Sequence, residues 1–273
     1  MMDKPTTQIT IRSHNLNGFE NSKEYILDEC GSNAFSILAV QEHWLRPSFK
    51  KSKGTNVMKV LHPDYDAYAT SAMDISKGPI KGRPFGGTGF MFHRSLSKCL
   101  RARVDIKHER ITVLEMNTNT QKILLINAYL PYFIIGNETQ LAEYRDTLAF
   151  IQSLLELHPS HKYILLMDMN CDIFDTKHPY TPLILSMMND FDLISSFSLI
   201  NDFDHKREYT RFDIKRNSFT LIDGILVSST LSKDIVSSAI VHPHTNTSDH
   251  LPVQITLDLE YEIFPCHKKP VNS

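Results

Sequence analysis

The segment Lys162–Asn170 reads KYILLMDMN, in which the unbroken apolar run Tyr163–Met167 is followed by an acid and an amide. A short run that is apolar at every position predicts a central β-strand buried on both faces. The polar residues Asp168 and Asn170 come at the end of this run. We therefore expect both side chains at the edge of a sheet, where loops commonly carry functional groups.

Nine further short apolar runs are bounded by turn residues and are predicted as strands. They are Gln8–Arg12, Ser36–Gln41, Asp66–Thr70, Thr88–Phe92, Thr112–Met116, Lys122–Tyr129, Thr220–Val227, Val236–Val241 and Val253–Leu259. Helical spacing of apolar residues, or a proline suited to a first turn, predicts three helices. These are Asn21–Glu29, Glu138–Leu157 and Pro182–Asp190. Two packed sheets flanked by helices would bury this number of strands, so we expect an α/β fold.

The composition is that of an ordinary globular protein. The chain has 273 residues, 41% of them apolar and 22% charged, which excludes a coiled coil, a collagen-like repeat and a largely disordered chain. Lys and Arg number 29 against 31 Asp and Glu, so any contact with nucleic acid must come from a local basic patch. The four cysteines stand far apart, which argues against a zinc site or a disulfide framework.

No linker or repeat divides the chain. We expect one domain over residues 1–263 and a frayed tail, or the start of a linker, over residues 264–273. The first residues lack the apolar core of a signal peptide, and the longest apolar stretch, Ile123–Gly136, is too short to span a bilayer. The expectation is a soluble intracellular protein without membrane contact.

Polar residues gather at the ends of the predicted strands. They are Asn15 and Asn17, Glu42, Asp168 and Asn170, Asp223, and the run Ser248–His250. Strand ends of one sheet converge on one rim, so these side chains are expected to meet. Their oxygen atoms suit magnesium, and a His–Asp pair can hold an imidazolium against the charge of a phosphate. Neither a P-loop nor a GxSxG motif occurs, which argues against those two classes of hydrolase.

Six short motifs in order along the chain carry a family resemblance. They are NLNG at Asn15–Gly18, QE at Gln41–Glu42, NAYLP at Asn127–Pro131, MDMN ending at Asn170, IDGILVS around Asp223, and SDH at Ser248–His250. Together they resemble the endonuclease/exonuclease/phosphatase superfamily. Two further stretches, RPFGGTGFMF at Arg83–Phe92 and YTRFD at Tyr209–Asp213, are most similar to the endonuclease domains of non-LTR (LINE-type) retrotransposons. The resemblance implies a four-layer α/β sandwich of two packed, mostly antiparallel β-sheets with helices outside.

The resemblance also implies how a metal and an attacking water are held. Glu42 resembles the family's ligand for magnesium (Mg²⁺), for which manganese (Mn²⁺) can substitute, and the amide of Asn15 helps to hold the metal. Asp168 and Asn170 resemble the pair that positions and activates the attacking water. The implied reaction is in-line attack of water on a phosphodiester, with magnesium stabilising the charge on the phosphate and the leaving oxygen.

Other side chains resemble groups that contact the phosphate. His250, oriented by Asp223, resembles the imidazole at the scissile phosphate, and Tyr129 resembles a tyrosine whose hydroxyl contacts it. Asp249 resembles an acid that shapes the environment of the metal and the histidine. Thr210 and Ser248 resemble polar partners at the floor of the cleft.

Two positions depart from the family pattern. Asn17 stands where apurinic endonucleases commonly carry an acid, which favours the retrotransposon type over abasic-site repair. We expect Asn17 to contact the substrate. Tyr132 follows the YLP motif where several relatives have an asparagine, so the DNA contacts of that loop are expected to differ.

A predicted β-hairpin, YTRFDIKRNSFT at Tyr209–Thr220, carries the cations Arg211, Lys215 and Arg216 near its tip. It connects Thr210 with Asp223, so its tip is expected to overhang the same cleft. Arginine side chains suit contact with the minor groove and with flexible base steps, and phosphate contacts should dominate the affinity for DNA. A solvated hairpin without a binding role is the alternative.

The leading hypothesis is a magnesium-dependent endonuclease that nicks double-stranded DNA to prime reverse transcription of a retrotransposon. It implies a reverse transcriptase domain as partner in a longer protein, a nuclear place of action and a monomeric catalytic domain. One alternative is a phosphatase or phosphodiesterase of the same fold that acts on a small or lipid phosphate. Another is a non-catalytic module that binds nucleic acid or protein, because the fold does not decide among these functions.

Overall fold

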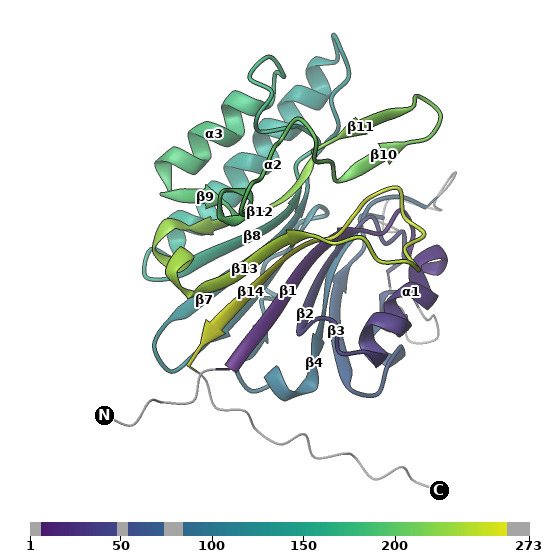
Figure 1. Ribbon diagram of the computed structural model, residues 1–273, viewed down its shortest axis with the longest axis vertical. Coiled ribbons are helices and arrows are strands. Elements are labelled where there is room, and N and C mark those ends of the chain that lie inside the picture. The colour runs from purple at the N-terminus through teal and green to yellow at the C-terminus, as the bar shows by residue number, and fades with distance from the viewer. Residues whose placement is uncertain (1–6, 48–53, 74–83, 261–273) are drawn as a thin grey trace, which may run out of the picture.

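The computed structural model describes residues 7–47, 54–73 and 84–260 of the chain. Two six-stranded sheets lie face to face, with one helix outside the first sheet and two outside the second (Figure 1). This arrangement confirms the predicted α/β sandwich. The predicted tail, residues 264–273, lies outside the described residues. No helix in the described part is long and apolar enough to cross a membrane.

The first sheet joins segments from both ends of the described chain. In spatial order its strands are β13 (Ile235–Ile240), β14 (Val253–Leu259), β1 (Thr7–Asn15), β2 (Ile37–Gln41), β4 (Thr88–His93) and β3 (Tyr65–Thr70). Strands β1 and β2 run parallel, with Asn15 opposite Gln41, and the other pairs are antiparallel. The ends of β1 and β2 therefore place Asn15 and Glu42 at the same edge.

The second sheet is built from the middle of the chain. Its strands, in spatial order, are β5 (Leu100–Ala102), β6 (Ile111–Asn117), β7 (Lys122–Tyr129), β8 (Lys162–Asp168), β12 (Asp223–Ser228) and β9 (Leu193–Ser195). Strands β7 and β8 are parallel and bring Tyr129 opposite Asp168. Strand β12 is antiparallel to β8 and brings Asp223 opposite Asp168 from the other side.

Three apolar clusters separate the layers. Aliphatic side chains from both sheets fill the space between them, and the long helix α2 (Glu138–Leu157) packs with α3 (Thr181–Asp190) on the outer face of the second sheet. Helix α1 (Phe19–Gly31) covers the outer face of the first sheet. The short 3₁₀ helices are η1 (Gly54–Val60), η3 (Arg94–Leu96), η4 (Ser196–Leu199) and η5 (Ser229–Asp234). Helix α2 has the predicted bounds because its apolar spacing is regular throughout.

One predicted strand needs correction. The segment Thr220–Val227 is not continuous, because Thr220 ends the hairpin strand β11 (Ser218–Thr220), paired with β10 (Arg211–Asp213), and β12 begins only at Asp223. At the break, the carbonyl of Ile222 accepts a hydrogen bond from the amide of Met169. The short strands β5 and β9 were not predicted, because three residues give too little alternation to detect.

Candidate active site

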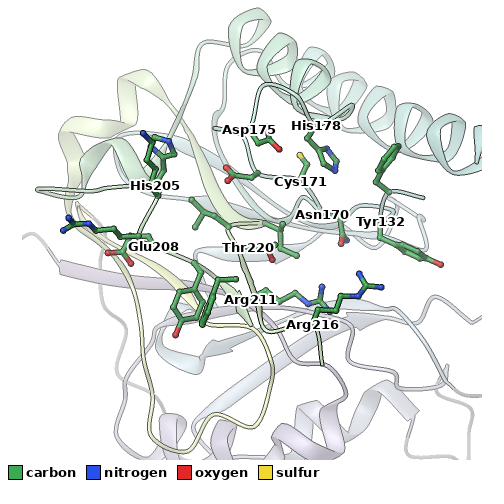
Figure 2. A pocket seen from close by; sticks show the side chains of 18 residues that line it. Tyr132, Asn170, Cys171, Asp175, His178, His205, Glu208, Arg211, Arg216 and Thr220 are labelled. Carbon is green, nitrogen blue, oxygen red and sulfur yellow. The ribbon is translucent and has the colours of Figure 1, made fainter. Parts of the chain in front are cut away.

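Two adjoining cavities open where the strand ends meet. The larger, of about 710 Å³, is lined by residues between 205 and 222 and by the segments around Phe133 and His178 (Figure 2). The smaller, of about 350 Å³, contains the polar side chains from the strand ends, and we call it the cleft. The two cavities share Tyr132, Asn170, Arg211 and Arg216 in their walls. The side chains for which the sequence predicts chemistry line this cleft or lie directly behind it, although it is the smaller cavity.

Most of the predicted site residues line the cleft. They are Asn15, Asn17, Glu42, Tyr129, Asp168, Asn170, Arg211, Arg216, Asp249 and His250. Among the remaining four, Asp223 and Thr210 are buried behind it and Ser248 is half-buried. Lys215 is exposed in the hairpin turn and does not line the cleft. Side chains from both sheets and from the hairpin thus meet at one place.

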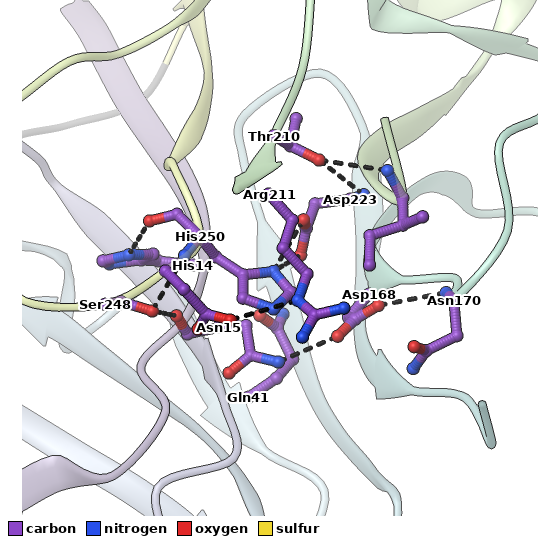
Figure 3. Close-up of polar contacts among 12 residues, drawn as sticks. His14, Asn15, Gln41, Asp168, Asn170, Thr210, Arg211, Asp223, Ser248 and His250 are labelled. Atoms are coloured by element: carbon purple, nitrogen blue, oxygen red, sulfur yellow. Dashed lines mark hydrogen bonds and ion pairs between the residues drawn. The ribbon is translucent and has the colours of Figure 1, made fainter. Parts of the chain in front are cut away.

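A buried ion pair joins the end of one sheet to the other. His250 Nδ1 lies 2.8 Å and 3.0 Å from the two carboxylate oxygens of Asp223, and the side chains are 6% and 2% exposed (Figure 3). Burial lowers the pKa of His250, but the charge and the hydrogen bond of Asp223 outweigh it and raise the pKa to about 9. Thr210 Oγ1 accepts hydrogen bonds from the amides of Ile222 and Asp223, which fixes the start of β12.

Asp168 is a second buried carboxylate in the same cleft. Its Oδ1 accepts a hydrogen bond from the amide of Asn170 and its Oδ2 accepts one from Asn15 Nδ2 at 2.8 Å (Figure 3). Burial, and next the charge of Asp223, raise the pKa of Asp168 to about 7. Asn170 in turn donates from Nδ2 to the carbonyl of Leu130, so the orientation of its amide is fixed. An acid with a raised pKa beside an oriented amide is suited to accept a proton from water.

The backbone at the cleft is conformationally unusual. Asn17, Glu42 and Asn170 have left-handed φ angles of 46°, 50° and 49°. Asparagine adopts this conformation readily, but glutamate does so at a cost, and such residues cluster at functional sites. Gly18, with φ of 104°, lies so close to the Trp44 ring that a Cβ atom there would be 2.5 Å from Cε3. The loop that carries Asn17 therefore requires glycine at its next position.

Glu42 is a partly exposed carboxylate of the cleft. Its Oε2 lies 3.4 Å from Asn15 Nδ2, so Asn15 bridges the carboxylates of Glu42 and Asp168. Burial, followed by the charges of Glu42 and Asp168, raises the pKa of Tyr129 well above its ordinary value, so its hydroxyl stays protonated. The Arg110 guanidinium lies 5.4 Å from the centre of the Tyr129 ring. Tyr129 can therefore donate a hydrogen bond within the cleft.

The donor set at Glu42 fits magnesium, which prefers one or two carboxylates plus waters and substrate oxygens. The buried group Asp168, Asp223 and His250 also has ligand atoms within 4.8 Å of one another. In that group, however, Nδ1 of His250 is already bonded to Asp223. The partly exposed carboxylate of Glu42 is therefore the better candidate for binding the metal. Asn15 turns its nitrogen toward both carboxylates while its Oδ1 accepts from the amide of Asn17, so its role as a ligand stays a prediction.

The hairpin is attached directly to the segment that carries His250. The amide of Phe212 donates to the carbonyl of Asp249, and the amide of Leu251 donates to the carbonyl of Thr210. Arg211 Nε lies 3.1 Å from Oδ2 of Asp249. The other carboxylate oxygen of Asp249, Oδ1, accepts a hydrogen bond from Asn17 Nδ2 at 2.9 Å. Arg211 is thus part of the cleft and not of the hairpin tip.

Two cations remain in the hairpin turn. The side chain of Arg216 is 84% exposed, with Nε 3.8 Å from Asp213, and Lys215 is exposed beside it. Sequence reasoning missed Asp213, although it belongs to the YTRFD motif and lines the cleft. It also missed most of the walls of the larger cavity, among them Cys171, Asp172 and His178, which lie between β8 and α3 in a loop without regular periodicity.

The sequence matches no protein-family model and no curated protein sequence. The fold is similar to that of the AP endonuclease LMAP from Leishmania major, with a TM-score of 0.73 and 15% identity over 92% of this chain and 88% of that one. It is also similar to the 3' phosphatase NExo from Neisseria, solved bound to product DNA hairpin, with a TM-score of 0.67 and 16% identity over 92% and 99% of the two chains.

A third similar structure is an AP endonuclease from Archaeoglobus fulgidus, with a TM-score of 0.66 and 17% identity over 92% of this chain and 100% of that one. At these identities the likeness establishes the fold, and function must be argued from the site. The fold is the one that the motif resemblance implies.

Proposed function

We propose that this chain is a magnesium-dependent endonuclease that nicks double-stranded DNA by hydrolysing a phosphodiester bond. The observation that carries the proposal is the joining of the Asp223–His250 ion pair and the bridge from Asp168 through Asn15 to Glu42 in one cleft. The proteins of similar fold include two AP endonucleases and a DNA 3' phosphatase, which supports a hydrolase that acts on DNA.

Each side chain has a role that its geometry supports. The protonated His250, held at Nδ1 by Asp223, can donate from its other ring nitrogen to a phosphate oxygen. Asp168 can accept a proton from the attacking water, which Asn170 orients. Tyr129 can donate a hydrogen bond from its hydroxyl to a phosphate oxygen. Magnesium bound at Glu42 would stabilise the charge on the phosphate and on the leaving oxygen.

The cations beside the cleft favour a polyanionic substrate. Arg211 and Arg216 line the cleft, and Lys215 is exposed in the same turn. Duplex DNA presents a row of phosphates that such cations can contact on either side of the bond to be cut. The motif resemblance extends the proposal to target nicking that primes reverse transcription, with a reverse transcriptase domain as partner and the nucleus as the place of action.

A DNA 3' phosphatase is the second candidate. The similar fold of the Neisseria enzyme, solved bound to a DNA hairpin product, favours it specifically. The two activities differ in whether the phosphate has one ester bond or two, and the same residues could serve both. A phosphatase removes a terminal phosphate without breaking the strand, so the products separate the candidates.

The test is incubation of the protein with supercoiled plasmid, with and without magnesium, beside His250→Ala as a matched control. Relaxed circles that form only with metal, and far more slowly with the variant, are the expected result. Removal of phosphate from a 3'-phosphorylated oligonucleotide without relaxed circles would replace the endonuclease by the phosphatase. DNA binding without either activity would overturn the enzymatic proposal.

A further inference from the structure

A second histidine lies directly behind the cleft. His14, the residue before Asn15 in β1, is 1% exposed. Its ring meets the Tyr25 ring of α1 edge-on, with the centroids 5.2 Å apart. Its Nε2 lies 3.2 Å from the carbonyl oxygen of His250 (Figure 3). His14 therefore contacts the backbone of the proposed catalytic histidine and not its imidazole.

The chemistry of this contact requires a hydrogen on Nε2 of His14. A carbonyl oxygen can only accept, so Nε2 must carry the hydrogen. In a neutral ring Nδ1 is then a bare acceptor, and Nδ1 of His14 is buried without a hydrogen-bond partner. A buried acceptor without a hydrogen bond is unfavourable. The phenyl ring of a phenylalanine would fill the same space and would carry no such acceptor. What histidine supplies here, and phenylalanine would not, is the hydrogen bond to His250.

We propose that His14 is a positioning residue that holds the backbone of His250 so that its imidazole meets Asp223. The His250 carbonyl accepts two hydrogen bonds, from His14 Nε2 and from Asn246 Nδ2 at 2.7 Å. The His250 amide donates to Ser248 Oγ at 3.1 Å. Because both sides of the residue are held, the direction of its side chain is fixed before any substrate binds.

The inference rests on the proposed function, because His250 matters only if it acts on the phosphate. Loss of the His14 hydrogen bond leaves Asn246 as the remaining donor to the carbonyl, so the segment would shift and not unfold. A misplacement of about 1 Å at a reacting group costs roughly a hundredfold in rate. We expect kcat of His14→Phe to fall ten- to a hundredfold, within that bound, with KM for plasmid unchanged.

The deciding measurement is the NMR signal of the His250 Nδ1 proton, shared with Asp223, in protein labelled with ¹⁵N-histidine. In His14→Phe this signal should shift or broaden as the hydrogen bond weakens. His14→Gln, whose amide nitrogen can reach the same carbonyl, should restore both the signal and kcat. Leu155→Ala, a core truncation in α2, is the control for general destabilisation and should leave the signal unchanged. An unchanged signal and unchanged kcat in His14→Phe would overturn the proposal.

A measurement on the unaltered protein covers the case in which His14→Phe does not fold. The ¹⁵N shifts of His14 should show a neutral ring with hydrogen on Nε2. Hydrogen on Nδ1 alone would overturn the proposal, because that tautomer cannot donate to His250. Neither NMR result depends on turnover. If the protein nicks no DNA but the signals behave as expected, the proposed function fails and the positioning role stands.

Discussion

The cleft floor and the hairpin lie side by side but are built differently. The floor (Asn15, Glu42, Asp168, Asp223 and His250) is held by hydrogen bonds among side chains at strand ends, and all but Glu42 are buried. The hairpin (Arg211–Thr220) is a pair of three-residue strands whose turn is exposed. A two-stranded unit of this length is not stable by itself, so its bonds to the His250 segment matter for its position.

Under the proposed function, this difference would separate chemistry from binding. Groups on a rigid floor can be pre-organised for one transition state, whereas exposed cations on a hairpin can adapt to a backbone of phosphates. Arg211 belongs to both regions, because it lies in the hairpin strand β10 and its side chain pairs with Asp249 in the cleft. Substitutions in the floor should therefore change turnover, and those in the hairpin turn should change affinity.

The largest effect is expected for Glu42→Gln in the floor. The substitution keeps the size of the side chain and removes the charge that would attract magnesium, so nicking should fall by about three orders of magnitude or more, comparable to loss of a major transition-state contact. The measurement is the plasmid nicking rate over a range of magnesium concentrations, beside thermal unfolding as the control for folding. Near-normal nicking at low magnesium would remove Glu42 from the floor's chemistry.

The second-largest effect is expected for His250→Ala. Its turnover should fall by about a hundred- to a thousandfold, the usual effect of losing one pre-organised hydrogen-bond donor. The affinity for DNA should stay within a few-fold, because the buried imidazole presents little surface to the duplex. Single-turnover nicking and a binding titration on the same DNA separate the two quantities. A variant that cleaves normally would show that His250 has a structural role only. The assignment of turnover to the cleft floor would then be wrong.

The sequence predicted the floor better than the hairpin's role. Asp168 ends a strand with an unbroken apolar run and Asn170 follows two residues later, so both the strand and its polar end could be recognised locally. The hairpin was also predicted, but not that Arg211 turns to Asp249, a contact between residues 38 positions apart. His14 gave no signal, because a histidine within a strand shows neither its burial nor its partner in the sequence.

A third effect, smaller at neutral pH, concerns the pH dependence of turnover. Burial lowers the pKa of His250, but Asp223 outweighs this effect and raises the pKa from 6.5 to about 9, so the imidazolium should persist until the pH rises through about 9. The rate should fall above that pH. In Asp223→Asn the alkaline limb should move to lower pH. The measurement is the nicking rate from pH 6 to 10, and an unmoved limb would mean that another group limits the rate.

The same pair contributes to stability with a defined sign. A folded-state pKa above the unfolded value stabilises the fold fully below pH 6.5, and the contribution is lost as the pH rises through about 9. Thermal unfolding of the unaltered protein should therefore show a loss of stability across that window. Asp223→Asn should show a smaller loss, which separates this ion pair from other titrating groups.

The smallest effect on turnover is expected in the hairpin turn, for Lys215 and Arg216 replaced together by Ala. Arg216 is 84% exposed at its side chain and Lys215 does not line the cleft, so the floor should keep its geometry. Turnover at saturating DNA should stay within about twofold. Each lost phosphate contact should reduce the slope of log affinity against log salt by about 0.9.

Arg211→Ala is the matched comparison, because it removes one cation from the same hairpin but also frees Asp249 in the cleft. It should reduce turnover as well as affinity. If the double variant reduces turnover as much as Arg211→Ala does, the hairpin turn belongs to the chemistry and the division between the two regions is wrong.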